Sequence, residues 1–261
     1  MTIWRHELRE GKISLLIWAF AIGFLMATCI LIYPEMAKQM GEISKVFSLM
    51  GSFSAAFGMD RINFGEFLGF FGVECGNVLG LGGAFYAALL GSSILAKEEK
   101  EHTAEFLLTH PKSRMSITGE KLFAVLTQIV ILNVVVIGIS AISIVMIGEK
   151  PDMKTLTLLF FAYFLLQIET AAICFGISAF LRSGGIGIGL GLAAIFYFLN
   201  IIANLTEKAE FLKYITPFGY TEGADIIAEK ALNGGYLAVG AMLTVLGIGI
   251  AFYQYNRKDI A

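Results

Sequence analysis

Charged residues are scarce in this sequence. Asp, Glu, Lys and Arg make up 15% of the 261 residues, whereas about a quarter of an ordinary globular domain is charged. Apolar residues account for 57% even without the 29 glycines, and the mean hydropathy is +0.75. Polar side chains are too few to cover a water-soluble protein of this size. These proportions exclude a soluble or a disordered chain and predict an integral membrane protein. We further predict that residues 1–261 form a single transmembrane domain.

Cysteine and histidine are also rare, with three of each. Cys29, Cys75 and Cys174 all fall inside apolar runs, which is typical of small buried side chains rather than of disulfides or metal ligands. The net charge of −2 provides no basic surface for nucleic acid. The sequence contains neither a zinc-binding HExxH pair nor a phosphate-binding Walker A loop. A membrane-embedded enzyme is therefore disfavoured, and any ATP-driven work would require another chain to bind the nucleotide.

Six stretches are long and apolar enough to cross a bilayer as helices. A hydrocarbon core about 30 Å thick requires roughly 20 residues of helix. We therefore predict an all-α membrane protein with six transmembrane helices. The predicted spans are residues 13–33, 67–96, 122–147, 156–181, 186–203 and 236–253.

Lysine and arginine are unevenly distributed between the two sides of this predicted bundle. Eleven of the 19 lie in the N-terminal segment, the loop 97–121, the turn at Arg182 and the C-terminal tail. The other eight are spread over longer loops on the opposite side. Because positively charged segments near the spans stay in the cytoplasm, we predict a multi-pass protein of the cell membrane with both termini cytoplasmic.

The predicted cytoplasmic loop between the second and third spans carries the most informative pattern. Its charged residues predict a helix from Glu98 to Leu108, with Phe106 and Leu107 in an apolar tip and Pro111 after its end. A short helix with an apolar tip suits a groove on a partner protein, although a solvated connecting helix explains the same pattern. His102, Glu105 and His110 of this loop could bind a metal ion together. A solvated amphipathic helix explains the presence of the same three residues without a metal.

The order of residues in this loop resembles that of the ABC-2 type exporter permeases. The shared pattern is an acidic residue, Thr, Glu, Leu-Leu, Pro, Ser-Arg and Lys, at Glu99, Thr103, Glu105, Leu107, Leu108, Pro111, Ser113, Arg114 and Lys121. The segment Tyr214–Tyr220 and the tail from Tyr255 to Ile260 are further points of similarity. With six spans, the resemblance covers nearly the whole chain.

The resemblance implies a permease subunit that dimerises with the same or a related chain and binds two separate ATPase subunits. Those partners would hold ATP and Mg, while this chain would bind no cofactor or metal and would not be an enzyme. It further implies short re-entrant helices before the last span, for which Phe211–Leu232 is the candidate, with Pro217 as a break. It implies a coupling helix in a groove of the ATPase, with these coupling residues: Glu98, Glu99, Thr103, Glu105, Phe106, Leu107, Leu108 and Arg114.

The N-terminal segment resembles the connector helix that such permeases carry on the inner membrane surface. Ile3, Trp4 and Leu8 share one face of a helix over residues 2–12, and the basic residues point toward the lipid headgroups. We therefore expect a separate amphipathic helix before the first span. Its principal residues are Trp4, Arg5, Leu8 and Arg9.

Two carboxylates lie within predicted spans, Glu169 near the middle of the fourth and Glu74 nearer the outer surface in the second. An ionised acid at the centre of a span costs roughly 2–3 kcal/mol or more, and no span contains Lys or Arg. Either residue could line a substrate pathway. Alternatively, each could be protonated or hydrogen-bonded to a polar neighbour, and the candidate neighbours are Asn77, Gln128, Asn133 and Gln167.

These observations favour the membrane subunit of an ATP-driven exporter that moves a hydrophobic or amphipathic molecule, such as a drug, a lipid or a peptide, out of the cell. The main alternative is an ion-coupled secondary transporter or channel in which Glu169 is the proton or cation site. No inverted pair of broken spans and no paired intramembrane charges support that alternative in the sequence.

Overall fold

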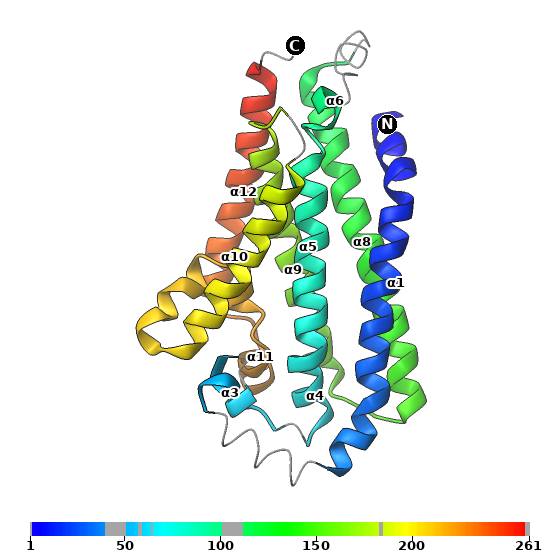
Figure 1. Ribbon diagram of the computed structural model, residues 1–261, viewed down its shortest axis with the longest axis vertical. Helices are drawn as coiled ribbons and strands as arrows, with labels where there is room; N and C mark the ends of the chain where they lie inside the picture. The colour runs from blue at the N-terminus through cyan, green and yellow to red at the C-terminus, as the bar shows by residue number, and fades with distance from the viewer. Residues whose placement is uncertain are drawn as a thin grey trace.

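The computed structural model describes residues 2–39, 51–56, 59–63, 65–100, 112–182 and 185–258, and these residues form helices and connecting turns with no β-strand. Six of the helical segments are long and apolar enough to cross a membrane (Figure 1). The all-α prediction is therefore confirmed for the described residues. The candidate spans are α1 (Thr2–Lys38), α4 with η2 and α5 (Phe67–Phe70, Phe71–Cys75 and Gly76–Ser93), α8 (Arg114–Ile147), α9 (Met153–Ser178), α10 (Ile186–Leu205) and α12 (Gly234–Arg257).

The first and last described residues lie at the same end of the helical bundle, which we call the terminal end (Figure 1). The short helix α6 (Lys97–Lys100) is also at this end. The short helices α3 (Ser52–Ala56) and α11 (Gly223–Glu229) lie at the opposite end, which we call the far end. An even number of crossings places both termini on one side, as the predicted topology requires.

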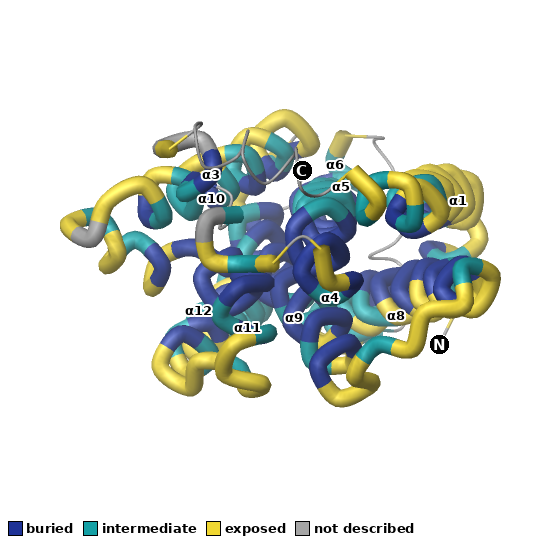
Figure 2. The backbone as a smooth tube through the Cα atoms, turned by 90° about the horizontal axis from the view of Figure 1, so that it is seen from below, coloured by how far each residue is buried: buried dark blue, intermediate teal, exposed yellow. Residues whose placement is uncertain are grey.

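Helices α5 and α9 occupy the centre of the bundle, where most of their residues are buried (Figure 2). Small residues on α5 let the two backbones approach closely. A Cβ atom at Gly91 would clash with the carbonyl oxygen of Ala171, and one at Gly83 would clash with the side chain of Gln167. Small residues are favoured between membrane helices because close packing replaces the hydrophobic effect that drives packing in water.

The outer helices instead expose large apolar side chains. Phe24 on α1, Val145 on α8, Phe198 on α10 and Val245 on α12 are all exposed, and the outer faces of α1 and α8 appear exposed along their length in Figure 2. Continuous apolar surfaces of this kind are typical of contact with lipid rather than water. The burial pattern therefore agrees with the composition.

Capping side chains decide where several of the spans begin. Ser113 caps α8 by accepting a hydrogen bond from the Ser116 amide, so this helix begins at Arg114 rather than near residue 122. Hydropathy alone misses these first turns because they carry polar residues. At the other end, Gly148 closes α8 in the left-handed conformation (φ 75°), which glycine adopts without strain.

The predicted separate connector helix is wrong: residues 2–12 form the first turns of the continuous helix α1. No proline interrupts residues 2–33, so nothing in the backbone forces a break. The amphipathic pattern itself is confirmed, since Ile3, Trp4 and Leu8 are partly buried whereas Arg5 and Arg9 are exposed.

Three short helices connect α10 to α12; the second and third lie within the predicted segment Phe211–Leu232, whereas the first begins four residues before it. They are η3 (Glu207–Tyr214), η4 (Pro217–Tyr220) and α11. Pro217 begins η4, and the Thr216 hydroxyl caps it by accepting a hydrogen bond from the Phe218 amide. The short helices and the break at Pro217 are therefore confirmed, whereas their entry into the membrane stays a prediction.

Candidate functional site

A group of buried ion pairs lies at the terminal end, around α6. Lys121 of α8 has no exposed surface. Its ammonium group contacts the carboxylate of Glu98, lies 3.6 Å from that of Glu7 and donates a hydrogen bond to the Ile94 carbonyl oxygen. Because an unpaired charge is costly to bury, the partners of Lys121 define where α6 sits. We use the name ion-pair cluster for the pairs that Lys97, Lys121 and Lys258 form with Glu7, Glu10, Glu98 and Glu99.

The second pair of the cluster ties α6 to the C-terminal end of α12. The ammonium group of Lys258 lies 2.5 Å from the carboxylate of Glu99 and also donates to the carbonyl oxygen of Leu181 at 2.5 Å. The backbone carbonyl of Lys258 in turn accepts a hydrogen bond of 2.5 Å from the guanidinium group of Arg114. These contacts join α6, α8, α12 and the residues that follow α9.

The third pair ties α6 to α1. Lys97 contacts the carboxylate of Glu10 and lies 3.5 Å from that of Glu7. Lys97, Glu98 and Glu99 of α6 are thus fixed to α1, α8 and α12 by charged contacts. A motion of α6 would therefore act on three spans together.

The structure places the predicted coupling residues in two groups. Glu98 and Glu99 turn into the bundle, with only 14% and 7% of their side chains exposed, so these two residues do not form the solvated face that a charged helix suggests. Arg114 holds the end of α12. The remaining predicted coupling residues lie outside the described residues: Thr103, Glu105, Phe106, Leu107 and Leu108.

Trp4, one of the predicted connector residues, packs against α8, whereas Arg5 and Arg9 are exposed. The indole N–H of Trp4 donates to the Thr127 hydroxyl at 3.2 Å, and its ring lies 5.6 Å from that of Phe123. The carboxylate of Glu120 accepts hydrogen bonds from the amides of Ile3 and Trp4 at 2.9 and 3.2 Å. A carboxylate of one helix thereby caps the N-terminus of another, which satisfies amides that have no partner within α1.

Glu169, the predicted carboxylate of the fourth span, is 3% exposed. Its Oε2 atom accepts a hydrogen bond of 2.8 Å from the hydroxyl of Tyr220 in η4. The predicted amide neighbours are wrong for this residue, because they pair elsewhere: Asn133 donates to Gln167, Tyr86 donates to Gln128, and Tyr197 donates to Asn77.

Glu169 lines a groove of about 360 Å³ between α9 and α12. The volume lies within the range of about 300–1,000 Å³ that small-molecule sites occupy. Glu169 is the charged residue of this lining, and the others are apolar or uncharged: Leu165, Ile168, Tyr220, Leu237, Gly240, Ala241, Thr244 and Val245.

Glu74, the other candidate pathway residue, lies apart from this groove. It sits in the single π-helical turn Phe71–Cys75 of the second span and is partly buried. No hydrogen bond or ion pair joins it to another described residue. The structure therefore does not bring the two predicted carboxylates into one site.

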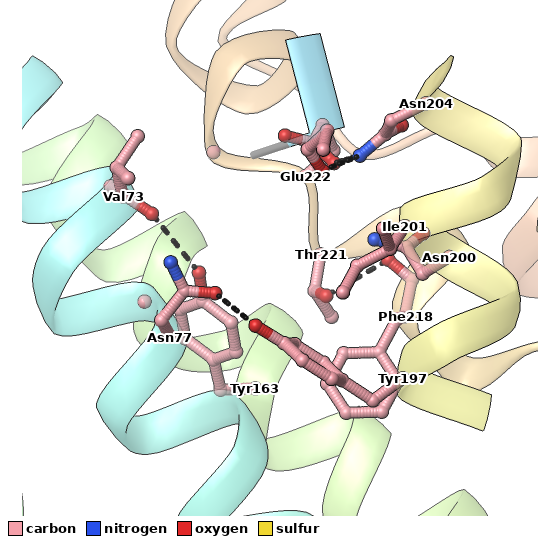
Figure 3. Close-up of a pocket in the computed structure, with 14 residues that line it drawn as sticks. Val73, Asn77, Tyr163, Tyr197, Asn200, Ile201, Asn204, Phe218, Thr221 and Glu222 are labelled. Atoms are coloured by element: carbon pink, nitrogen blue, oxygen red, sulfur yellow. Dashed lines mark hydrogen bonds between the residues drawn. The ribbon is translucent and has the colours of Figure 1, made fainter. Parts of the chain in front are cut away.

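A small polar cavity of about 40 Å³ lies between α5, α10 and the residues around Glu222 (Figure 3). Asn204 donates to the Glu222 carboxylate at 2.8 Å, and the Tyr197 hydroxyl donates to Asn77 at 3.2 Å. The side-chain oxygens of Asn200 and Asn204 have no hydrogen-bond partner among the described residues. At about 10–15 Å³ per water, this cavity has room for a few water molecules but not for an organic substrate.

The family model for the ABC-2 family transporter proteins matches residues 1–260 of this chain. The chain belongs to this family. A search of curated proteins returns no match. The membrane domain of ABC-2 transporters lacks a nucleotide-binding site, and ABC-2 permeases generally partner with ABC ATPases, which bind the ATP. The resemblance seen in the loop pattern is thus confirmed over nearly the whole chain of this ABC-2 transporter.

Sequence analysis missed several residues that form these sites. Glu7, Lys258 and Tyr220 were not singled out, because each acts through a partner far away in the sequence. One available signal was the acidic Glu7 on the otherwise apolar side of the N-terminal helix. A buried acid at such a position requires a cation nearby.

Proposed function

We propose that this ABC-2 transporter is the permease subunit of an ATP-driven exporter that carries a hydrophobic or amphipathic molecule out of the cell. It acts as a single membrane domain, with the terminal end on the cytoplasmic side. It pairs with a second permease chain, the same or related, and with two ATPase subunits. Family membership supports the transport role. The ion-pair cluster supports a mechanism in which motion of the ATPase reaches the spans through α6.

The observation that carries the proposal is the attachment of α6 to three spans. The predicted coupling helix continues from α6, so a partner that moves this loop pulls on α6 first. Lys121 and Lys258 link α6 to α8 and α12 through Glu98 and Glu99. Both acids are largely buried, so these ion pairs have little room to rearrange. A displacement of α6 is therefore transmitted directly to α8 and α12.

This arrangement divides the predicted coupling residues between two roles. Glu98, Glu99 and Arg114 anchor the base of the loop within the permease. The apolar tip Phe106–Leu108 enters the groove of the ATPase. Substitutions in the tip would then weaken binding of the ATPase, whereas substitutions at the anchor would leave binding intact and reduce transport.

Co-purification tests this division. A tagged chain isolated from its native membrane in mild detergent should retain an ABC ATPase, identified by mass spectrometry, and deletion of Phe106–Leu108 should remove it. The double variant Phe211→Ala/Ile215→Ala is the matched control, because it removes exposed apolar side chains at the far end. An ATPase that stays bound after the deletion, or ATP hydrolysis by the purified chain alone, would contradict the proposal.

Cysteine labelling tests the orientation. In a variant with Cys29, Cys75 and Cys174 replaced by serine, a new cysteine at Ser113, at the terminal end, should react with a membrane-impermeant maleimide only in opened cells. A new cysteine at Lys208, at the far end, should react in intact cells. Both positions are exposed in the structure, and the reverse labelling pattern would place the termini outside.

A further inference from the structure

We propose that the groove beside Glu169 binds a lipophilic ammonium, that is, a molecule with a protonated amine and an alkyl or aromatic body. The amine would approach the Glu169 carboxylate and the body would lie along α9 and α12. Binding there requires no ATPase, so the inference can fail while the proposed function holds.

The groove combines one buried carboxylate with apolar walls. Glu169 is 3% exposed and lines the groove with Leu165 and Leu237, among others. Gly240 faces the carboxylate, and a Cβ atom at this position would clash with its Oε2 atom. The absence of a side chain at Gly240 thus lets the carboxylate lie directly against the backbone of α12, at the wall of the groove.

The hydrogen bonding of Glu169 favours a cation. Tyr220 supplies one neutral hydrogen bond to Oε2, and no Lys, Arg or His forms an ion pair with Glu169 in the described part of the chain. A carboxylate in apolar surroundings is stabilised most by a directly paired positive charge. An anionic ligand would be repelled, and an uncharged one would leave the carboxylate unpaired.

Tyr220 holds the carboxylate in place rather than competing with the ligand. It is buried in η4, and η4 is fixed to α10 because the Thr216 hydroxyl donates to the carbonyl oxygen of Phe196 at 2.8 Å. The acid is therefore oriented before a ligand arrives, which reduces the entropy lost on binding.

The depth of Glu169 favours a free lipophilic amine over the headgroup of a phospholipid. At about 1.5 Å per residue, Glu169 lies roughly 14 Å or more from either end of α9. The ammonium group of phosphatidylethanolamine stays at the membrane surface, whereas a single-chain amine can descend along the apolar face. Val245 of α12 is exposed and lines the groove, and it gives that face the required apolar character.

Dodecylamine is a suitable probe, with dodecanol and dodecanoate as length-matched controls. The purified chain in phosphatidylcholine nanodiscs should bind dodecylamine saturably in native mass spectrometry and unfold at a higher temperature in its presence. Dodecanol and dodecanoate should bind at least tenfold more weakly. Equal binding of dodecanol, or loss of dodecylamine binding when phosphatidylethanolamine is added to the nanodiscs, would overturn the proposal.

Variants locate the binding within the molecule. Glu169→Gln should weaken dodecylamine binding at least tenfold, whereas Glu74→Gln, which removes the other membrane carboxylate, should leave it unchanged. Ala241→Phe fills the groove from an exposed position on α12, so it should abolish binding without lowering the unfolding temperature, even if the Glu169 variant folds poorly. Wild-type binding by the Ala241 variant, or equal losses in both glutamate variants, would refute the site.

Discussion

Lys121 and Glu98 form an ion pair in which the lysine side chain has no exposed surface. Lys121 lies in α8, whereas Glu98 lies in the short helix α6, at the start of the predicted coupling helix. The ammonium group also lies near Glu7 of α1 and donates to the Ile94 carbonyl oxygen. One lysine thus connects the base of the loop to two spans.

Replacing Lys121 should test the strength of this connection. Lys121→Met keeps much of the side-chain volume but leaves the Glu98 carboxylate without its cation and removes one of the two cations near Glu7. Removing one partner of a buried ion pair costs roughly 3–5 kcal/mol, and we expect a loss of this order in the free energy of unfolding, measured by SDS titration. The double variant Lys121→Met/Glu98→Gln should recover part of the loss.

Lys38→Met provides the control for the Lys121 variant. Lys38 pairs with Glu35 at 2.7 Å, but both side chains are about 70% exposed. Exposed pairs contribute about 0–1 kcal/mol, so this change should be nearly neutral. Equal losses for the two lysine variants would show that burial of the cluster has no energetic consequence.

Glu120 should hold the first turn of α1 against α8. Its carboxylate accepts hydrogen bonds from the Ile3 and Trp4 amides and lies 2.5 Å from the ammonium group of Lys112. Hydrogen bonds to a charged group contribute about 1.5–3 kcal/mol, so Glu120→Ala should free the first turn. Faster hydrogen exchange at residues 3–6, with unchanged exchange in α9, is the expected result.

Glu120→Gln is the conservative comparison, because one oxygen accepts both amide hydrogen bonds and the glutamine oxygen can replace it, whereas the charge that pairs with Lys112 is lost. Its exchange rates should lie between those of the native protein and those of Glu120→Ala. Native exchange rates in the alanine variant would show that packing of Trp4 alone fixes the N-terminus.

Gly247 should set the distance between α12 and α9. A Cβ atom there would meet the Ala172 carbonyl oxygen at 2.5 Å, whereas nothing lies within 4 Å of a Cβ atom at Gly249. Overpacking a close contact costs about 1–3 kcal/mol. Gly247→Leu should therefore lower the unfolding temperature clearly and Gly249→Leu should not, although both residues lie in the same helix. The opposite order would disprove this contact.

Asp152 should make a small part of the stability depend on pH. Its carboxylate caps α9, and hydrogen bonds from the Thr155 hydroxyl and then from Lys230 lower its pKa below the usual value. The stabilisation is therefore complete above the pKa of the unfolded chain, about 3.9, and is lost as the pH falls through the lower pKa of the folded protein.

Asp152→Asn isolates this contribution, because asparagine also caps helices well. The variant should be slightly less stable than the native protein at pH 6, and the difference between the two unfolding temperatures should shrink as the pH falls from 6 to 3. The difference should be small because the side chain is exposed to solvent. A gap that stays constant between pH 6 and pH 3 would assign the effect to packing instead.

The sequence contained the information that defines the helices. The thickness of a bilayer sets the length of a span, and the lack of water inside the bilayer requires every backbone group to pair within its own helix. Long apolar runs therefore predict six helices without knowledge of their neighbours. The break at Pro217 was predictable for a similarly local reason, because proline has no amide hydrogen to donate.

Contacts between distant residues were decided only by the tertiary structure. The sequence marked Glu98 and Glu99 as charged residues of a loop helix, but only the packing of α6 against α8 and α12 turns them toward Lys121 and Lys258. Likewise, Glu169 was predictable as an acid within a span, whereas its partner Tyr220 comes from a short helix outside that span. An ion pair or a hydrogen bond acts over only a few ångströms, so the choice of partner depends on how the helices approach one another. A hydrophobic run is instead stabilised in lipid residue by residue, whichever helices lie beside it.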